Sequence, residues 1–180
     1  MARLTYMRNI IPSLVLFAGF VSGVCPAQAK GKSANTQAAQ TKALLQKFEA
    51  IQKRQAQEDA NKKLVLDFYQ RFFGDKDISA ADKYLAPSYI QHNPLAATGR
   101  DAVKRFFTPF FANPAIPKTK IDVRRVAADG DLVWLHIRSK TTGSARAVVD
   151  IFRIKDNKIV EHWDVIQPVP AKSANSNTMF

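Results

Sequence analysis

The stretch of sequence that decides the fold runs from Asp131 to Pro168 and reads DLVWLHIRSKTTGSARAVVDIFRIKDNKIVEHWDVIQP. Two turn segments, one around Gly143 and one at Asp156-Asn157, divide it into three runs rich in β-branched and aromatic residues. The predicted strands are Asp131–Lys140, Ala145–Ile154 and Lys158–Pro168. A further alternating run, Ile121–Ala127, ends at the turn Asp129-Gly130-Asp131. Because every connection is short, these runs predict a four-stranded antiparallel meander.

Helical patterns occupy the chain upstream of this meander. The first is a strongly apolar stripe that ends at Gly74 and consists of Leu64, Val65, Phe68, Tyr69, Phe72 and Phe73. A second helix is predicted over Ile78–Leu85 and a third from Gly99 to Phe111, with an extended piece from Ser88 to Pro94 between them. Helices followed by strands are typical of an α+β fold. We therefore expect a cone-shaped, curved antiparallel sheet packed on three N-terminal helices, with a mouth suited to a small molecule.

Residues 1–29 have the pattern of a secretory signal peptide. Arg3 and Arg8 precede an uncharged apolar run, Ile10–Val24, and Ala27-Gln28-Ala29 supplies the small residues that a signal peptidase requires. The alternatives are a membrane anchor, for which the run is short, and a lipoprotein anchor at Cys25. Cleavage after Ala29 predicts a periplasmic or secreted protein that lacks its only cysteine.

A polar segment rich in Lys, Gln and Ala, residues 30–57, separates the signal peptide from the domain at 58–170. Its first part, Lys30–Gln40, is expected to be disordered. From Thr41 onwards one helical stripe is expected, carried by Leu44, Leu45, Phe48 and Ile51. That helix is either a solvated spacer or a surface that packs on the domain or a partner. Residues 171–180 form a polar tail.

The formal net charge is +12, but the basic residues are scattered and form no dense block. We therefore expect no specific nucleic-acid binding, and the short apolar run predicts no stable membrane insertion. Neither a glycine-rich phosphate loop nor a nucleophilic Ser or Cys motif is present.

The candidate catalytic residues are Asp150 and His136. A symmetric turn centred on Gly143 sets His136 directly across from Asp150, where opposed Cβ atoms lie about 4.5–5.5 Å apart. Trp134 and Phe152 share that face. A carboxylate tuned between desolvation and a nearby imidazole can remove a proton next to a carbonyl. The alternative is a structural or exposed His–Asp pair.

The last strand offers a second set of candidates whose direction depends on one turn. If Asp156-Asn157 is a two-residue loop, Trp163 faces the same way as Asp150. If the loop holds three residues, His162 and Asp164 do so instead. His92, in the extended piece, is expected at the rim. Because no tight ligand spacing links these side chains, no metal is expected.

The run from Asn61 to Pro170 resembles the SnoaL-like polyketide cyclase family of the nuclear transport factor 2 and ketosteroid isomerase fold superfamily. The resemblance is carried by YIQHNP (Tyr89–Pro94), GRDAV (Gly99–Val103), VDIFR (Val149–Arg153) and EHWDVIQ (Glu161–Gln167). The tail SANSNTMF (Ser173–Phe180) is similar to that of the predicted aldol-condensation subgroup.

The resemblance implies cofactor-free aldol chemistry in which an aspartate is acid and base beside a histidine fourteen residues earlier, which matches Asp150 and His136. Trp134 stands where the cyclases have a glutamine, a departure that bears on a polyketide substrate. We expect an exported homodimer that acts on a small hydrophobic ligand containing a carbonyl, as an aldol-type cyclase or isomerase. The alternative is a non-catalytic ligand-binding or envelope interaction module.

Overall fold

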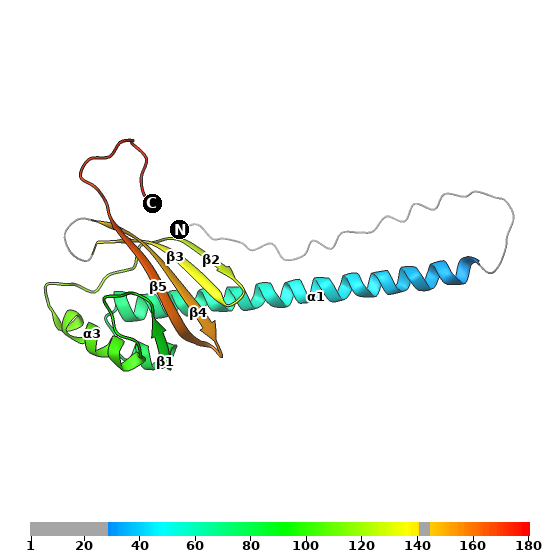
Figure 1. Cartoon of the computed structure of the whole chain (residues 1–180), viewed down its shortest axis with the longest axis horizontal. Coiled ribbons are helices and arrows are strands. Elements are labelled where there is room, and N and C mark those ends of the chain that lie inside the picture. The colour runs from blue at the N-terminus through cyan, green and yellow to red at the C-terminus, as the bar shows by residue number, and fades with distance from the viewer. Residues whose placement is uncertain (1–28, 141–144) are drawn as a thin grey trace, which may run out of the picture. The chain divides into compact units, whose positions relative to one another are not determined.

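The structure is a computed structural model that describes residues 29–140 and 145–180 (Figure 1). Its elements are α1 (Ala29–Tyr69), the π-helix η1 (Gln70–Gly74), α2 (Ala80–Tyr84), β1 (Leu85–Gln91), α3 (Arg100–Ala112), β2 (Val123–Asp129), β3 (Leu132–Ser139), β4 (Arg146–Lys155) and β5 (Lys158–Pro168). The chain divides into two units, one ending at Leu44 and the other running from Leu45 to Phe180. Apart from Ala29, the predicted signal peptide lies outside the described residues. Within the described ranges, no helix is both long and apolar enough to span a bilayer.

The sheet has five strands in the order β1-β5-β4-β3-β2 (Figure 1). Strands β2 to β5 form the antiparallel meander that the sequence predicts. The extended piece between the second and third helices begins earlier than expected and becomes β1, which pairs in parallel with β5. The α+β class with helices against a curved sheet is confirmed, and the sheet gains a fifth strand at its β5 edge.

The core lies between one face of the sheet and the helices, and the C-terminal part of α1 crosses that face in Figure 1. Alternate side chains of β3 and β4 point into it, as strand geometry requires. The largest fully buried side chains are Val65, Phe72, Leu85, Val133, Leu135, Phe152 and Ile159. Phe72 is surrounded by four other phenylalanine rings, Phe68, Phe73, Phe107 and Phe111.

Helix α1 is longer than the sequence predicts. Residues Lys30–Gln40 are helical, whereas composition alone favours disorder there. The physical reason is that Ala, Gln and Lys are all strong helix formers. Downstream, the side chains of Leu44, Leu45, Phe48 and Ile51 are 57–68% exposed, as expected for a solvated helix. Cover of this stripe by a partner stays a prediction.

Two polar side chains of α1 hold the turn between β2 and β3. The buried Asn61 amide donates to the carbonyl oxygen of Gly130 at 3.0 Å. The Glu58 carboxylate accepts the N–H of Gly130 at 2.8 Å. Both backbone groups of a tight turn are therefore satisfied by the helix, which fixes how the meander sits on α1.

Gly74, at the end of η1, lies against the segment that leads into β2. The Thr119 N–H donates to the Gly74 carbonyl oxygen at 2.9 Å. A Cβ at position 74 would lie 2.6 Å from the Thr119 carbonyl oxygen and would overlap the Gln70 side chain. Gln70 has little freedom to move, because its amide oxygen accepts the Ile121 N–H and its amide nitrogen donates to the Thr119 oxygen.

Gly74→Ala is therefore expected to lower the free energy of unfolding by about 1–3 kcal/mol, the usual cost of overpacking. Urea denaturation measures this change. Gly130→Asn is the control, because Gly130 has open space at its Cβ position and a φ of +62°, which asparagine tolerates. Equal stability of Gly74→Ala and the wild-type protein would show that Thr119 and Gln70 move aside without any loss of unfolding free energy.

Candidate functional site

The register between β3 and β4 decides which side chains share the site. Leu135, and not His136, pairs with Asp150, while His136 pairs with Val149. The predicted pairing of His136 with Asp150 is therefore wrong. The last paired residues are Ser139 and Arg146, so six residues connect the strands, whereas a symmetric turn centred on Gly143 requires an odd number. A slip of one residue moves a side chain to the other face of the sheet.

His136 consequently lies on the outer face, away from Asp150. Its Nδ1 accepts from the Arg125 guanidinium at 3.0 Å, and its ring stacks on Phe180 with centroids 6.0 Å apart. Trp134 lies on the same outer face and pairs with Ile151. Neither predicted residue contributes to the surroundings of Asp150.

Two further predicted residues, Trp163 and His92, also lie on the outer face. Their rings stack in parallel with centroids 4.4 Å apart. The Arg153 guanidinium lies over the Trp163 ring, and Glu161 pairs with both His92 and Arg153. This is a surface stack beside the edge strand β1, separated from Asp150 by the sheet.

A bulge in the β4–β5 hairpin brings a different pair to Asp150. The turn at Asp156-Asn157 holds two residues, both with positive φ (49° and 60°), as an Asp-Asn hairpin turn allows. A two-residue loop alone would turn Trp163 inwards. However, Ile154 pairs with Ile159 while Arg153 pairs with Glu161, so Val160 is an extra residue in β5. Beyond it His162 lies opposite Phe152, and Asp164 lies opposite Asp150.

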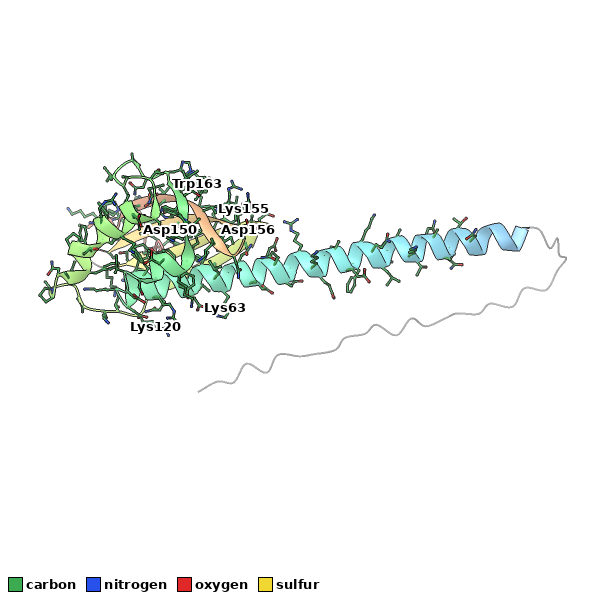
Figure 2. All side chains as sticks on the ribbon, turned by 90° about the horizontal axis from the view of Figure 1, so that it is seen from below. Lys63, Lys120, Asp150, Lys155, Asp156 and Trp163 are labelled. Atoms are coloured by element: carbon green, nitrogen blue, oxygen red, sulfur yellow. The ribbon has the colours of Figure 1, made fainter. Side chains whose placement is uncertain are left out.

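The centre of the candidate site is a buried pair formed by Asp150 and His162. The His162 Nε2 lies 2.9 Å from Asp150 Oδ1. The Asp150 side chain is only 6% exposed and the His162 side chain 10%. The other carboxylate oxygen, Oδ2, accepts the hydroxyl of Tyr69 at 2.9 Å. The Phe152 ring stacks on His162 with centroids 4.7 Å apart. Figure 2 shows Asp150 within the packed domain.

Strand β1 and the residues after it supply the polar surroundings of this pair. Tyr89, Gln91 and Asn93 alternate with outward residues and therefore point to one side. The Gln91 amide oxygen lies 2.9 Å from His162 Nδ1, and its nitrogen lies 3.3 Å from the Tyr89 hydroxyl. The Asn93 amide nitrogen lies 2.8 Å from both oxygens of Asp164. Gln91, Asn93 and Asp164 are half-buried, whereas Asp150 and His162 are buried.

Sequence reasoning did not select Tyr69, Tyr89, Gln91 or Asn93. The period of two in Tyr89-Ile90-Gln91-His92-Asn93 was the available signal, because it separates the inward polar residues from His92. Tyr69 had no comparable signal, since it sits in an apolar helical stripe where a core role is the ordinary one.

Two tyrosines at the site have shifted pKa values. Burial raises the pKa of Tyr69 well above its usual value of 10.0, and the charge of Asp150 raises it further. Burial, and then the charge of Asp150, also raise the pKa of Tyr89. The phenol of Tyr69 therefore stays protonated in the folded protein and remains a donor to Asp150 throughout the usual pH range.

This shift predicts a loss of stability in alkali. The unfolded chain ionises Tyr69 near pH 10, whereas the folded chain keeps it neutral. The contribution of Tyr69 to the free energy of unfolding is therefore complete below pH 10 and is lost as the pH rises above it. Tyr69→Phe should make the dependence of unfolding free energy on pH shallower above pH 10, by up to about 1.4 kcal/mol per pH unit. Urea denaturation between about pH 9 and 11 measures both slopes. Parallel slopes for the two proteins would contradict the shift.

Three side chains of the site could together hold a metal ion. One ligand atom from each of Asp150, His162 and Asp164 lies within 4.8 Å of the other two, and carboxylate and imidazole ligands suit several divalent ions. Here Asp150 is hydrogen-bonded to His162, and Asp164 is hydrogen-bonded to Asn93. That the chain works without a metal stays a prediction.

Comparison with known proteins places this chain in a family. A family model described as SnoaL-like domain matches residues 65–162, more than half of the chain. A nuclear transport factor 2-like protein of unknown function from Burkholderia xenovorans LB400 has a TM-score of 0.53 at 15% identity, covering 64% of this chain and 89% of that one. No curated protein has a significant match.

Two further solved structures share the fold. A candidate ketosteroid isomerase from Kribbella flavida has a TM-score of 0.53 at 16% identity, covering 66% of this chain and 85% of that one. A candidate SnoaL-like polyketide cyclase from Jannaschia sp. CCS1 has a TM-score of 0.50 at 19% identity, covering 61% and 86%. Identities this low show a common architecture, and the chemistry has to be argued from the site itself.

Proposed function

The chain belongs to the SnoaL-like domain family, and from this premise we propose that it catalyses cofactor-free proton transfer next to a carbonyl. The reaction class is an aldol-type cyclisation or an isomerisation of a small hydrophobic compound. The single observation that carries the proposal is the buried pair of Asp150 and His162, with 2.9 Å between Oδ1 and Nε2. A carboxylate and an imidazole in contact, screened from water, form a general acid–base unit.

Asp150 is the base in the proposed reaction. Its carboxylate takes a proton from the carbon next to the substrate carbonyl, and the electrons of the broken C–H bond form the enolate. The captured proton stays on the Asp150 carboxyl group, while His162, bonded to Oδ1, and Tyr69, bonded to Oδ2, keep that group in place. The proton then returns to carbon in an isomerisation, or goes to the alkoxide formed with the new C–C bond in an aldol closure.

The surroundings of the pair support an apolar substrate. The Phe152 ring stacks on His162, and the Tyr69 ring lies against Phe152 with centroids 6.3 Å apart. Half-buried Asn93 and Asp164 lie beside the pair and offer polar contacts to a carbonyl or hydroxyl group. The substrate class is therefore a small, largely apolar carbonyl compound.

Hydrogen–deuterium exchange at the α-carbon of a panel of small ketones tests the proposal without a known substrate. The wild-type protein should accelerate the exchange of at least one ketone, and Asp150→Asn should abolish that acceleration while the protein remains folded. EDTA should leave the rate unchanged, because no metal takes part. Equal exchange with wild-type protein and Asp150→Asn across the panel would favour a non-catalytic ligand-binding module.

We also propose that the chain is exported and cleaved after Ala29. The support is the pattern of Arg3, Arg8, the apolar run Ile10–Val24 and the small residues before the cleavage point. Mass spectrometry of the periplasmic and secreted fractions should find a mature N-terminus at Lys30. An intact Met1 on soluble cytosolic protein would contradict export.

A further inference from the structure

We infer that Gln91 is a positioning residue that fixes the tautomer of His162, so that the bond between His162 and Asp150 holds a single transferable proton. The contacts of the Gln91 amide oxygen carry this inference, and they do not depend on the identity of the substrate. Only the kinetic part of the test rests on the proposed acid–base function.

The orientation of the Gln91 amide is fixed by the backbone. The N–H of Asn93 lies 3.1 Å from Gln91 Oε1, and a backbone N–H can only donate. The atom at that position must therefore be the oxygen and cannot be the amide nitrogen. The nitrogen of the same amide then points to the Tyr89 hydroxyl oxygen, which can accept.

The orientation of the amide dictates the proton on His162. Gln91 Oε1 has no proton to give, so the 2.9 Å contact with His162 Nδ1 is a hydrogen bond only if Nδ1 donates. Nδ1 therefore carries a proton. In the neutral imidazole the other nitrogen, Nε2, is then a bare acceptor that faces Asp150.

One proton is left to occupy the contact between Nε2 and Asp150 Oδ1. Either Asp150 is protonated and donates to neutral His162, or Asp150 is ionised and accepts from the imidazolium. Both forms contain the same number of protons and differ only in where that proton sits. Because the Tyr69 hydroxyl donates to Oδ2, Oδ1 is the oxygen that exchanges this proton with His162.

His136 supplies an internal reference with the opposite tautomer. Its Nδ1 lies 3.0 Å from the Arg125 guanidinium, which has only protons to donate. Nδ1 of His136 is therefore the acceptor, and the proton of its neutral ring sits on Nε2. His136 and His162 therefore have opposite tautomers, and Gln91 contacts His162.

Nitrogen NMR of ¹⁵N-histidine-labelled full-length mature protein tests the assignment, with no substrate present. In the wild-type protein His162 should show a protonated Nδ1 and His136 a bare one. Gln91→Met keeps the length of the side chain and removes the acceptor, and should shift His162 towards the other tautomer. Gln91→Glu keeps an acceptor and should restore the protonated Nδ1. His136 should not change in either variant.

The kinetic part uses the same two variants in the α-carbon exchange assay, with thermal melts to confirm that they fold. Gln91→Met should lower the exchange rate by tenfold or more, up to the ~10⁴-fold cost of a wrong tautomer in a serine protease triad. Gln91→Glu should recover most of the wild-type exchange rate. A bare Nδ1 of His162 in the wild-type protein, or an unchanged Nδ1–H in Gln91→Met, would overturn the inference. A failure of the proposed function would instead abolish exchange in the wild-type protein and leave the NMR result intact.

Discussion

His162→Gln is expected to lower the rate of α-carbon exchange by roughly 10²–10⁴-fold, the range that a general acid–base group contributes. The glutamine amide can still contact Asp150 Oδ1, but it cannot exchange a proton with that oxygen as the imidazole does. The variant should therefore lose rate and keep its fold, which circular dichroism can confirm.

The matched control for this variant is His136→Gln. It makes the same chemical change on the other face of the sheet, at a residue that contacts Arg125 and Phe180. Its exchange rate should stay within about twofold of the wild-type rate, because no group at the proton-transfer site is altered. A loss of rate in His136→Gln equal to that in His162→Gln would reject the site described here in favour of the pairing expected from the sequence.

Phe72→Ala is expected to lower the free energy of unfolding by about 3–5 kcal/mol, a large part of the roughly 5–15 kcal/mol that holds a typical domain together. The Phe72 side chain is 0% exposed, and its ring centroid lies 4.9–5.3 Å from those of four neighbouring phenylalanines. Removing the ring leaves a cavity that these rings, anchored on α1, η1 and α3, can fill only in part. Urea denaturation measures the loss.

Phe106→Ala is the control for this core variant. Phe106 lies on the same helix as Phe107, but its side chain is 42% exposed. The same substitution should therefore cost about 1 kcal/mol or less, since little apolar surface is lost from the interior. Similar costs for the two variants would mean that the cluster around Phe72 collapses to fill the gap.

The architecture could be predicted from the sequence because local patterns determine it. The alternation in 131–168 and the turn residues at Asp156-Asn157 specify the strands, and the aromatic stripe before Gly74 specifies the helix that covers them. The hydrophobic pattern carries this information without any knowledge of the exact pairing. Asp150, in contrast, is selected through an expected pairing with His136, which the register does not contain, and through the family resemblance.

The partners of Asp150 could not be predicted because they depend on register. The number of residues between Ser139 and Arg146 turns His136 outwards, and the extra residue Val160 turns His162 inwards. The amino-acid sequence does not show clearly how many residues of a loop stay unpaired, or where a strand contains a bulge. Either feature moves every residue that follows to the opposite face of the sheet. For the same reason Trp134 and Trp163 lie on the other side of the sheet. His92, expected at the rim from its place in the extended piece, lies there too, stacked on Trp163.

The parallel pairing of β1 with β5 also determines when the site can form as the chain folds. Gln91 and His162 are 71 residues apart in sequence, so their contact closes a long loop and forms only after the whole meander is available. The polypeptide must be complete almost to its end before the imidazole acquires its partner. A chain released early from the ribosome, or clipped within β5, would keep most helical segments but lack the proton-transfer pair. Catalytic competence would therefore report on the last step of folding, and it should return later than helical structure when the unfolded protein is allowed to refold.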